Sequence, residues 1–313
     1  MKIGIIGQGY VGTAIKSGFE KHYELETYDK FSTSKSTVNL HDLVLLSDVI
    51  FVCVPTPMNK DGSCHTDIVE EVILEINEIS ISSESKPTVV IKSTVPPGTT
   101  DRLHRKCKGI DVIFNPEFLT EMNFLEDFKN QSRIILGGIR RGTNKLRQVY
   151  SKVFPKTTIV KTSATYAEMV KYFVNCFLAT KVSFANEMKL ICDEIDIDYD
   201  KVVEYATHDE RLGKSHWAVP GPDGDYGFGG HCLPKDLNAL ITYGASPRAT
   251  IFLAKAARSH AFLNKRGFVI PEDVRYVGDS ILNHRIILSY EAEAEDITSD
   301  NIIQRIYKSV PTP

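Results

Sequence analysis

The residues with the clearest chemical potential lie in one decapeptide, GFGGHCLPKD, at residues 227–236. Three glycines come shortly before Cys232, and Asp236 follows one helical turn later. Glycine permits close approach of another molecule and backbone angles that other residues avoid, so a ligand could reach a thiol placed here. The alternative is a glycine turn that leads into a helix and leaves the cysteine buried. The decapeptide alone favours neither.

A second group of polar residues lies on a long apolar helix predicted over 165–192. Lys171 and Asn175 are spaced i, i+4 and therefore share one helix face. A lysine in such a run either snorkels to solvent or is functional. Snorkelling is the commoner case, and the asparagine one turn later weakens that preference. Arg211, in the polar loop DERLG at 209–213, could hold an anionic ligand, although a solvated loop arginine fits equally well.

The amino terminus carries a nucleotide-binding pattern. The glycines of GxGxxG, Gly7, Gly9 and Gly12, lie between a predicted strand at 2–6 and a predicted helix at 11–19. A second predicted strand, at 23–29, ends at Asp29, 22 residues after Gly7, where a carboxylate accepts hydrogen bonds from an adenosine ribose. That carboxylate would repel a 2'-phosphate, which favours NAD over NADP. The alternative is a structural turn followed by an unrelated acid.

Four further segments rich in valine and isoleucine predict strands buried on both faces, at 48–57, 87–98, 111–118 and 132–138. Helical stretches between several of them predict an α/β fold with a doubly wound parallel Rossmann-type sheet. Ligands of such sheets bind at the carboxyl ends of the strands. The polar residues that follow three of the strands are Thr56, Thr94 and Glu117. Each fits ordinary turn chemistry, but their shared edge favours a site.

Composition excludes several other classes of function. The chain has 313 residues and a net charge of −3, which gives no reason to expect nucleic acid or an anionic membrane as partner. Its six cysteines are scattered without a CxxC pair, so we expect no metal site and no disulfide framework. Scattered thiols, the absence of a transmembrane-length apolar run, and a first strand at residue 2 without a preceding signal peptide predict a cytoplasmic protein.

The last seventy residues show helical patterns and no strand pattern. Apolar residues at 251, 253, 254, 257, 261 and 262 predict a packed helix, and residues 279–290 are apolar on a helical period. Pro271 suits the first position of a helix, and Thr298 suits the N-cap of a last one. We therefore predict three parts: a Rossmann-like domain at 1–162, a helical central segment at 163–242, and a small all-helical domain at 243–313.

Together these motifs resemble the UDP-glucose and GDP-mannose dehydrogenase family. The matching stretches run in the family's order: GQGYVG at 7–12, PTP at 55–57, IKSTVPPG at 91–98, NPEFLTE at 115–121, the helix with Lys171 and Asn175, and GFGGHCLPKD at 227–236. The resemblance covers residues 1 to about 242. It implies that a primary alcohol of a sugar nucleotide is oxidised to a carboxylate with two hydride transfers to NAD.

The resemblance also implies a role for each matching residue. Cys232 would attack the aldehyde and carry a thiohemiacetal and then a thioester, in keeping with thiolate chemistry. Lys171 and Asn175 would stabilise the oxyanion, and Asp236 would assist acid–base steps. Thr94 would hold water and Glu121 would act as general base. The implied cofactor residues are Gly7, Gly9, Tyr10, Val11, Gly12, Asp29, Thr56, Thr94 and Glu117. The implied substrate residues are Glu117, Phe118, Leu119, Lys171, Asn175, Arg211, Phe228 and Gly229.

The substrate and the assembly are also implied by the family. NPEFLTE resembles the UDP-glucose and GDP-mannose branches more than the N-acetylhexosamine branch, and UDP-glucose is the first expectation. Thr120 stands where the family usually has a basic residue. In the family Arg211 would reach the sugar nucleotide across the interface of a homodimer.

Residues after about 243 resemble a different family, the C-terminal lid of MoxR-type AAA ATPases. The matching stretches are GASPR at 244–248, PEDVR at 271–275 and HRIILSYEAEAE at 284–295. In those ATPases the arginine at Arg248 senses nucleotide, but no GxxxxGK[ST] phosphate loop occurs here, so we expect no ATP hydrolysis and a structural Arg248. The chain looks like a fusion, natural or engineered, in place of the family's third domain. A core that has lost turnover and acts as a scaffold is the alternative to a working enzyme.

Overall fold

The computed structural model describes residues 1–230, 232–243, 247–282 and 298–309. The described residues form two compact units. The first combines Met1–Asn59 with Cys64–Leu237, and the second combines Lys60–Ser63 with the described residues after Leu237. The predicted division into three parts stays a prediction.

Seven strands of the described chain form one sheet, in the order β2-β1-β3-β4-β5-β6-β7. Their bounds are β1 Lys2–Ile6, β2 Glu24–Tyr28, β3 Val49–Val52, β4 Thr88–Ile91, β5 Asp111–Phe114, β6 Arg133–Gly137 and β7 Thr158–Thr162. Neighbouring strands are parallel except β5 and β6, which pair antiparallel. The predicted Rossmann-type α/β fold is confirmed, and the antiparallel pair and the strand β7 are additions to it.

The register of the sheet aligns the residues that matter for a ligand. Ile6 of β1 lies opposite Tyr28 of β2, so the loop that starts at Gly7 begins beside Asp29. Val52, Ile91 and Phe114, the last residues of β3, β4 and β5, are paired in one row. The polar residues that follow these strands therefore leave the sheet at one edge, as the sequence predicted.

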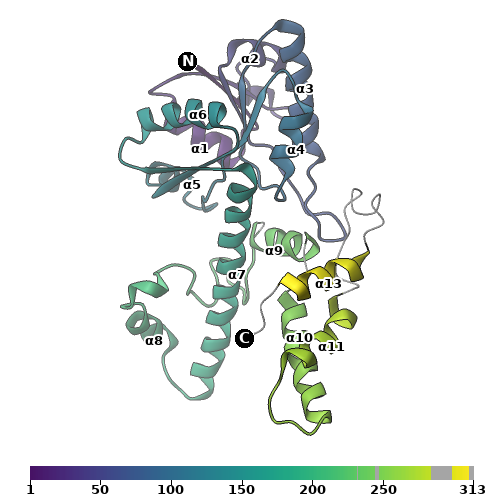
Figure 1. Cartoon of the computed structure of the whole chain (residues 1–313). Coiled ribbons are helices and arrows are strands. Elements are labelled where there is room, and N and C mark those ends of the chain that lie inside the picture. The colour runs from purple at the N-terminus through teal and green to yellow at the C-terminus, as the bar shows by residue number, and fades with distance from the viewer. Residues whose placement is uncertain (231, 244–246, 283–297, 310–313) are drawn as a thin grey trace. The chain divides into compact units, whose positions relative to one another are not determined.

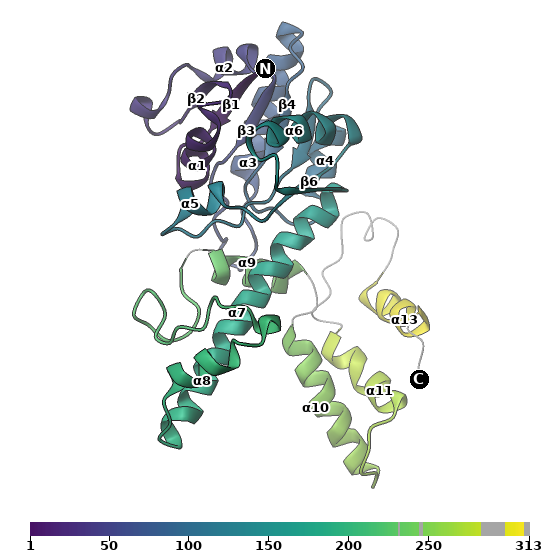
Figure 2. The same cartoon turned by 90° about the vertical axis from the view of Figure 1, so that its left-hand side faces the viewer.

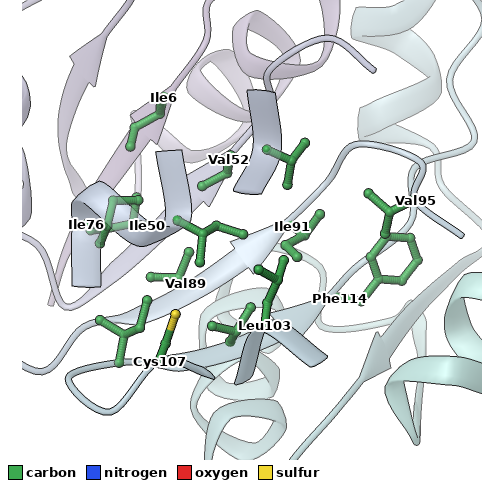
Figure 3. Packing of buried hydrophobic residues seen from close by; sticks show 14 of the residues in the cluster. Ile6, Ile50, Val52, Ile76, Val89, Ile91, Val95, Leu103, Cys107 and Phe114 are labelled. Atoms are coloured by element: carbon green, nitrogen blue, oxygen red, sulfur yellow. The ribbon is translucent and has the colours of Figure 1, made fainter. Parts of the chain in front are cut away.

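Helices cover both faces of the sheet. One face packs against α1 (Tyr10–Phe19), α5 (Phe124–Lys129) and α6 (Arg140–Val153). The other packs against α2 (Leu40–Leu46), α3 (Asp67–Ser83) and α4 (Thr99–Lys106). Figure 3 shows the second layer, where Ile76 and Leu103 pack on strand residues such as Val89. The strands are continuously apolar and bury side chains in both layers. This burial of apolar surface stabilises the fold, so the helices do not need a strong helix propensity of their own.

The helix α7 (Ala164–Glu194) leaves the sheet and carries the predicted Lys171 and Asn175 (Figure 1). It begins at Ser163, whose side chain accepts a hydrogen bond from the Tyr166 amide. The buried Glu168 accepts hydrogen bonds from the amides of Gly98 (2.6 Å) and Thr100 (2.8 Å), at the start of α4. Glu168 thus joins α7 to the loop after β4.

The far end of α7 continues into α8 (Tyr199–Ala206), as Figure 2 shows, and then into a short 3-10 helix, η2 (Glu210–Leu212). A second 3-10 helix, η1 (Thr33–Lys35), follows β2. The segment before α9 (Cys232–Tyr243) is loop. None of the helices in the described residues, α7 included, has the long apolar run that a membrane span requires.

The second unit is helical, as predicted, with α10 (Pro247–Leu263), α11 (Pro271–Leu282) and α13 (Ser299–Ser309). The fully buried Asp273 accepts hydrogen bonds from both terminal nitrogens of Arg266 (2.7 and 2.6 Å) and from the Ile270 amide (2.9 Å), and it contacts His260 at 2.7 Å. This network joins α10 to α11. Burying the charged Asp273 is tolerated because each oxygen is paired.

Most of the predicted features of this unit are confirmed. Pro271 begins α11, and the Thr298 hydroxyl accepts a hydrogen bond from the Asn301 amide. The predicted packing of Ala254 and Phe262 is wrong: Ala254 is exposed, and the side chain of Phe262 is 77% exposed while the neighbouring Ala261 is buried. The side chain of Arg248 and the segments 244–246 and 283–297 lie outside the described residues.

We predict that Glu168→Gln lowers the stability of the first unit. The amide nitrogen of glutamine would face a backbone N–H that now donates to a carboxylate oxygen, and one buried donor would lose its partner. We expect the free energy of unfolding to fall by about 1–3 kcal/mol, measured by urea denaturation. Glu187→Gln, at a position further along the same helix, is the control. Equal stability of Glu168→Gln and the wild type would contradict the capping role.

Candidate active site

The three glycines of the first loop each meet a different requirement. Gly7 has a φ of +88°, and its amide donates to the carbonyl of Tyr28 at 2.9 Å. A Cβ at Gly12 would lie 1.9 Å from the carbonyl oxygen of Gly7, so the helix can approach the strand only with glycine there. A Cβ at Gly9 would meet nothing within 4 Å, which leaves open space next to the loop. Tight turn, ligand approach and close helix packing are the glycine roles of a dinucleotide-binding loop.

The surroundings of this loop also fit a dinucleotide. Helix α1 starts at Gly9 without a side-chain cap and without acidic residues in its first turn, so its first amides are available to an anion. Asp29 accepts hydrogen bonds from the amides of Gln8 (2.8 Å) and Phe31 (3.0 Å). Tyr10 is 57% exposed at the same loop, and Val11 packs into the core. These residues could hold NAD, with Asp29 still able to accept from ribose hydroxyls.

A buried thiol lies between two of the predicted strand-end residues. The Cys64 thiol donates to the carbonyl oxygen of Thr94 at 3.5 Å, and it also forms a hydrogen bond with the buried Thr56. Burial raises the pKa of the Cys64 thiol, which keeps it protonated. The sequence did not single out Cys64, because it follows a loop rather than a strand.

The third strand-end residue, Glu117, pairs with the predicted helix lysine. The ammonium of Lys171 donates to the Glu117 backbone oxygen at 2.7 Å and to its carboxylate at 3.2 Å. The side chain of Lys171 is only 6% exposed, which excludes snorkelling to solvent. Burial raises the pKa of Glu117, but the opposing effects of Lys171, the Leu119 amide and Lys92 outweigh it and leave that pKa below its usual range.

The next turn of α7 contacts the start of α9. Asn175 donates from its side-chain amide to Asp236 at 2.6 Å, and Lys235 pairs with the other oxygen of the same carboxylate. Asp236 is 1% exposed, and its buried carboxylate is compensated by the positive charge of Lys235 and the hydrogen bond from Asn175. On the predicted helix face, Lys171 therefore contacts Glu117, and Asn175 contacts Asp236.

Cys232 lies at the first position of α9, one turn before Asp236. It is exposed at the surface, although the atoms packed around its sulfur raise the pKa of the thiol. The positive charge of Lys171 acts in the opposite direction and lowers that pKa, while Glu117 raises it. Cys232 is thus an exposed residue whose thiol is kept protonated by burial, and Lys171 is the strongest influence toward the thiolate that a nucleophile requires.

The glycines before Cys232 shape the loop that precedes it. Gly227 and Gly230 have φ values of +87° and +76°, a region that other residues rarely adopt. A Cβ at Gly229 would lie 2.1 Å from a carboxylate oxygen of Asp223. The Gly227 amide donates to Asn186 of α7 at 2.9 Å, and Phe228 is half-buried beside it. The glycines thus allow a sharp loop that leaves the thiol accessible.

Two other predicted substrate residues surround the ion pair. The Phe118 ring lies under the Arg133 guanidinium, 4.5 Å from ring centroid to the guanidinium carbon, and the Lys171 ammonium is 5.4 Å from that centroid. The Leu119 amide donates to the Glu117 carboxylate at 2.7 Å. The segment 117–119 is therefore fixed from both sides.

Two predicted residues are not brought to this cluster. Arg211 is 88% exposed at the side chain and pairs with its neighbour Asp209 in η2. Glu121 is exposed on the loop before α5, and no contact within the described residues joins it to Cys232. Both belong to exposed loops, whose side chains the backbone alone does not direct. Their predicted roles stay predictions.

A buried lysine next to the site was missed. Lys92 directly follows β4, is 4% exposed, and donates to the Asn115 side-chain oxygen at 3.0 Å and the Pro116 carbonyl at 3.4 Å. A charged residue at the end of the apolar run VVIK is the sequence signal that could have found it. Within the described residues, no cluster of potential metal ligands occurs.

Family models match nearly the whole chain. Residues 22–156 match the NAD binding domain of the UDP-glucose/GDP-mannose dehydrogenase family, and residues 165–261 match its central domain. Residues 236–306 match an AAA lid domain, so residues 236–261 match both kinds of domain.

Curated relatives are dehydrogenases of two sugar nucleotides. A GDP-mannose 6-dehydrogenase of Pseudomonas aeruginosa is 30% identical and aligns with 97% of this chain and 70% of its own length. The UDP-glucose 6-dehydrogenases AglM of Haloferax volcanii and TuaD of Bacillus subtilis are each 30% identical. The chain spans 65% of the length of AglM and 59% of the length of TuaD.

Solved structures agree with this family. A UDP-glucose dehydrogenase from Pyrobaculum islandicum superposes with a TM-score of 0.68 at 29% identity, covering 89% of this chain and 68% of that one. A ternary complex of a Pseudomonas aeruginosa GDP-mannose dehydrogenase gives a TM-score of 0.63 at 26% identity, covering 100% and 80%.

We predict that the alkylation of Cys232 by iodoacetamide depends on Lys171. The rate should rise with pH through a midpoint above the usual thiol range, and Lys171→Met should move that midpoint to higher pH because a stabilising positive charge is lost. The rate is followed by mass spectrometry of the Cys232 peptide. Lys181→Met is the matched control, because this buried lysine of α7 binds the carbonyls of Leu212 and Gly213 instead. An unchanged midpoint in Lys171→Met would remove Lys171 from the environment of the thiol.

Proposed function

Since the chain belongs to the UDP-glucose/GDP-mannose dehydrogenase family, we propose that it oxidises the C6 alcohol of a sugar nucleotide to a carboxylate with NAD. The observation that carries this proposal is the accessible Cys232 next to two paired groups, Lys171 with Glu117 and Asn175 with Asp236. These residue types are those that an aldehyde-to-acid oxidation through a thioester requires. We expect no metal in the reaction.

The proposed reaction proceeds in four steps at Cys232. The primary alcohol loses a hydride and a proton and becomes an aldehyde. The Cys232 sulfur adds to the aldehyde carbon and forms a thiohemiacetal, which loses a second hydride and its hydroxyl proton to give a thioester. Water then hydrolyses the thioester, releasing the carboxylate and restoring the thiol. NAD would be held by the loop Gly7–Gly12 and by Asp29 and would accept the hydride in each oxidation, so the first NADH must leave and a second NAD must bind before the thiohemiacetal is oxidised.

The buried cations and amides have defined tasks in this scheme. Lys171 and Asn175 donate to the oxygen of the aldehyde and stabilise the negative charge that develops when sulfur attacks. Asp236 holds the Asn175 amide in place and accepts protons during the acid–base steps. Thr94 positions the hydrolytic water near the same edge of the sheet, and Glu121 would serve as the general base. Glu117 keeps the Lys171 ammonium close to the carboxyl end of β5.

The substrate is proposed as UDP-glucose, with GDP-mannose as the second candidate. The GDP-mannose candidate is favoured by the Pseudomonas aeruginosa relative, which aligns with 97% of this chain at 30% identity. Segment 117–119 and residues 228–229 would bind the sugar nucleotide. Arg211 is 88% exposed at the side chain and pairs with Asp209, and we propose that it serves the site of a second copy in a homodimer.

The helical unit after residue 237 has no assigned part in this chemistry. Its match to an AAA lid domain comes without a phosphate loop in the chain, so we expect no ATP hydrolysis. A core without turnover that acts as a scaffold is the competing proposal. It requires NAD binding without substrate-dependent reduction.

We predict that Cys232→Ser abolishes acid formation while NAD binding persists, because a serine hydroxyl is a far weaker nucleophile than a thiolate. The wild type is incubated with NAD and, in turn, UDP-glucose, GDP-mannose and UDP-N-acetylmannosamine, and the acid product is detected by mass spectrometry. Cys107→Ser, at a buried thiol of the same unit, should retain acid production. Full acid production by Cys232→Ser would show that Cys232 is not the nucleophile.

We predict that Asp29→Ala weakens NAD binding by about tenfold, the effect of losing a charged hydrogen-bond acceptor. Discrimination against NADP should also decrease, because the repulsion of its 2'-phosphate is removed. Both affinities are measured by calorimetry, with Glu24→Ala on the same strand as the control. If NAD affinity and NADP discrimination both stay at wild-type levels, Asp29 does not belong to the cofactor site.

A further inference from the structure

Lys92 is a buried charge that the proposed chemistry does not use. Its ammonium lies at the end of β4, 4% exposed, and is bound to the side chain of Asn115 and the carbonyl of Pro116. Transfer of an ammonium from water to such a site costs several kcal/mol unless partners compensate. An apolar residue could end the strand without that cost, so the position of the charge requires a reason.

The partners of Lys92 form a rigid network. The Asn115 side-chain amide donates to the Ile135 carbonyl at 2.8 Å, and its oxygen accepts from the Tyr150 hydroxyl at 2.6 Å as well as from Lys92. Tyr150 is fully buried in the layer beneath. Lys92 is therefore held in a fixed position, bound to the carbonyl of Pro116, the residue directly before Glu117.

Lys92 and Glu117 affect each other's pKa. Burial lowers the pKa of Lys92 to about 8, while Glu117 and the buried Cys53 thiol oppose that effect and Lys171 adds to it. Lys92 is in turn one of the groups that keep the pKa of Glu117 low, after Lys171 and the Leu119 amide. Two buried lysines, Lys92 after β4 and Lys171 on α7, therefore both lower the pKa of Glu117.

We propose that Lys92 is a positioning residue, which fixes the turn 115–117 and supplies the second positive charge that holds the Glu117 carboxylate in place for Lys171. The part that concerns turnover rests on the proposed function. In this scheme Lys92 contacts neither the Cys232 thiol nor the substrate. It acts on Lys171 through Glu117.

The direct test is the titration of Glu117 in the full-length protein. Glutamate side chains are labelled with ¹³C at the carboxyl carbon, and the Glu117 signal is assigned from its loss in Glu117→Gln. In Lys92→Gln, which keeps a hydrogen-bond donor but removes the charge, the Glu117 midpoint should move to higher pH. In Lys92→Arg, which keeps the charge, it should remain near the wild-type value.

Lys181→Gln is the matched control for this titration. Lys181 is also buried, also donates to two carbonyls, and does not contact Glu117, so its loss should leave the Glu117 midpoint unchanged. The same Glu117 midpoint in Lys92→Gln and the wild type would overturn the proposal. If Lys92→Gln does not fold, the reciprocal experiment decides: Glu117→Gln should lower the midpoint of Lys92, followed with ¹³C-labelled lysine, and an unchanged midpoint would overturn the proposal.

Turnover gives the second readout. In Lys92→Gln we expect kcat to fall about tenfold, with the acid limb of its pH profile displaced to higher pH and the KM for NAD unchanged. Lys92→Arg should restore the position of the acid limb. A merely structural role would lower activity without displacing that limb. If the wild type fails to reduce NAD with every sugar nucleotide tested, the proposed function is contradicted. The Glu117 titration tests the role of Lys92 in either case, because it needs no turnover.

Discussion

The contact on which the site depends is the buried ion pair between Lys171 and Glu117. Removing either partner would leave an unpaired charge in the interior, which costs about 3–5 kcal/mol. The pair joins α7 to the end of β5 and so sets the rotation of α7 about its own axis. Glu168 lies one turn before Lys171 and caps α4, and Asn175 lies one turn after it and holds Asp236. One register of one helix therefore satisfies three buried polar contacts, and a rotation of α7 would break all of them together. Because Asp236 follows Cys232 by one turn, the same register determines which groups surround the sulfur.

The sequence predicted the features that leave a local pattern. Five of the first six strands, β1 and β3 to β6, appear as apolar runs, and α7 and the C-terminal helices appear as helical periods. The strand β7 was missed because Val160 is 45% exposed and the segment TIVKT lacks a continuous apolar run. The antiparallel pairing of β5 and β6 leaves no local signal either.

In the site, sequence spacing was enough to predict that Asp29 follows the glycine loop at the neighbouring strand end, and that Lys171 and Asn175 share one helix face. The pairing of Lys171 with Glu117 joins residues 54 apart in the chain, and it follows only from the tertiary structure. Glu121 could be singled out only by resemblance, and the polar loop around Arg211 fitted a ligand and plain solvent exposure equally well, because no packing directs these exposed side chains.

The two compact units rely on different kinds of stabilisation. The first has a layered core in which both faces of the sheet are covered by helices. The second is small, and its described part is organised around the buried carboxylate of Asp273, which Arg266 and the Ile270 amide neutralise. Residues 236–261 match both the family's central domain and an AAA lid domain, so the resemblance changes in a stretch that begins in α9 and ends in α10. A helix is a suitable place for such a change, because amphipathic helices of unrelated proteins share the same apolar period.

The stoichiometry of NADH per sugar nucleotide tests the proposed chemistry most directly. Purified protein, excess NAD and a limiting amount of UDP-glucose, or of GDP-mannose if UDP-glucose is inert, are followed by NADH absorbance until the reaction is complete. We expect two NADH per sugar nucleotide, because the alcohol is oxidised first to the aldehyde and then, through the Cys232 thioester, to the acid. One NADH per sugar nucleotide would mean that the reaction stops at the aldehyde, and it would contradict the role of the thiol. No NADH with any sugar nucleotide, while NAD still binds, would contradict the enzymatic function and favour a scaffold.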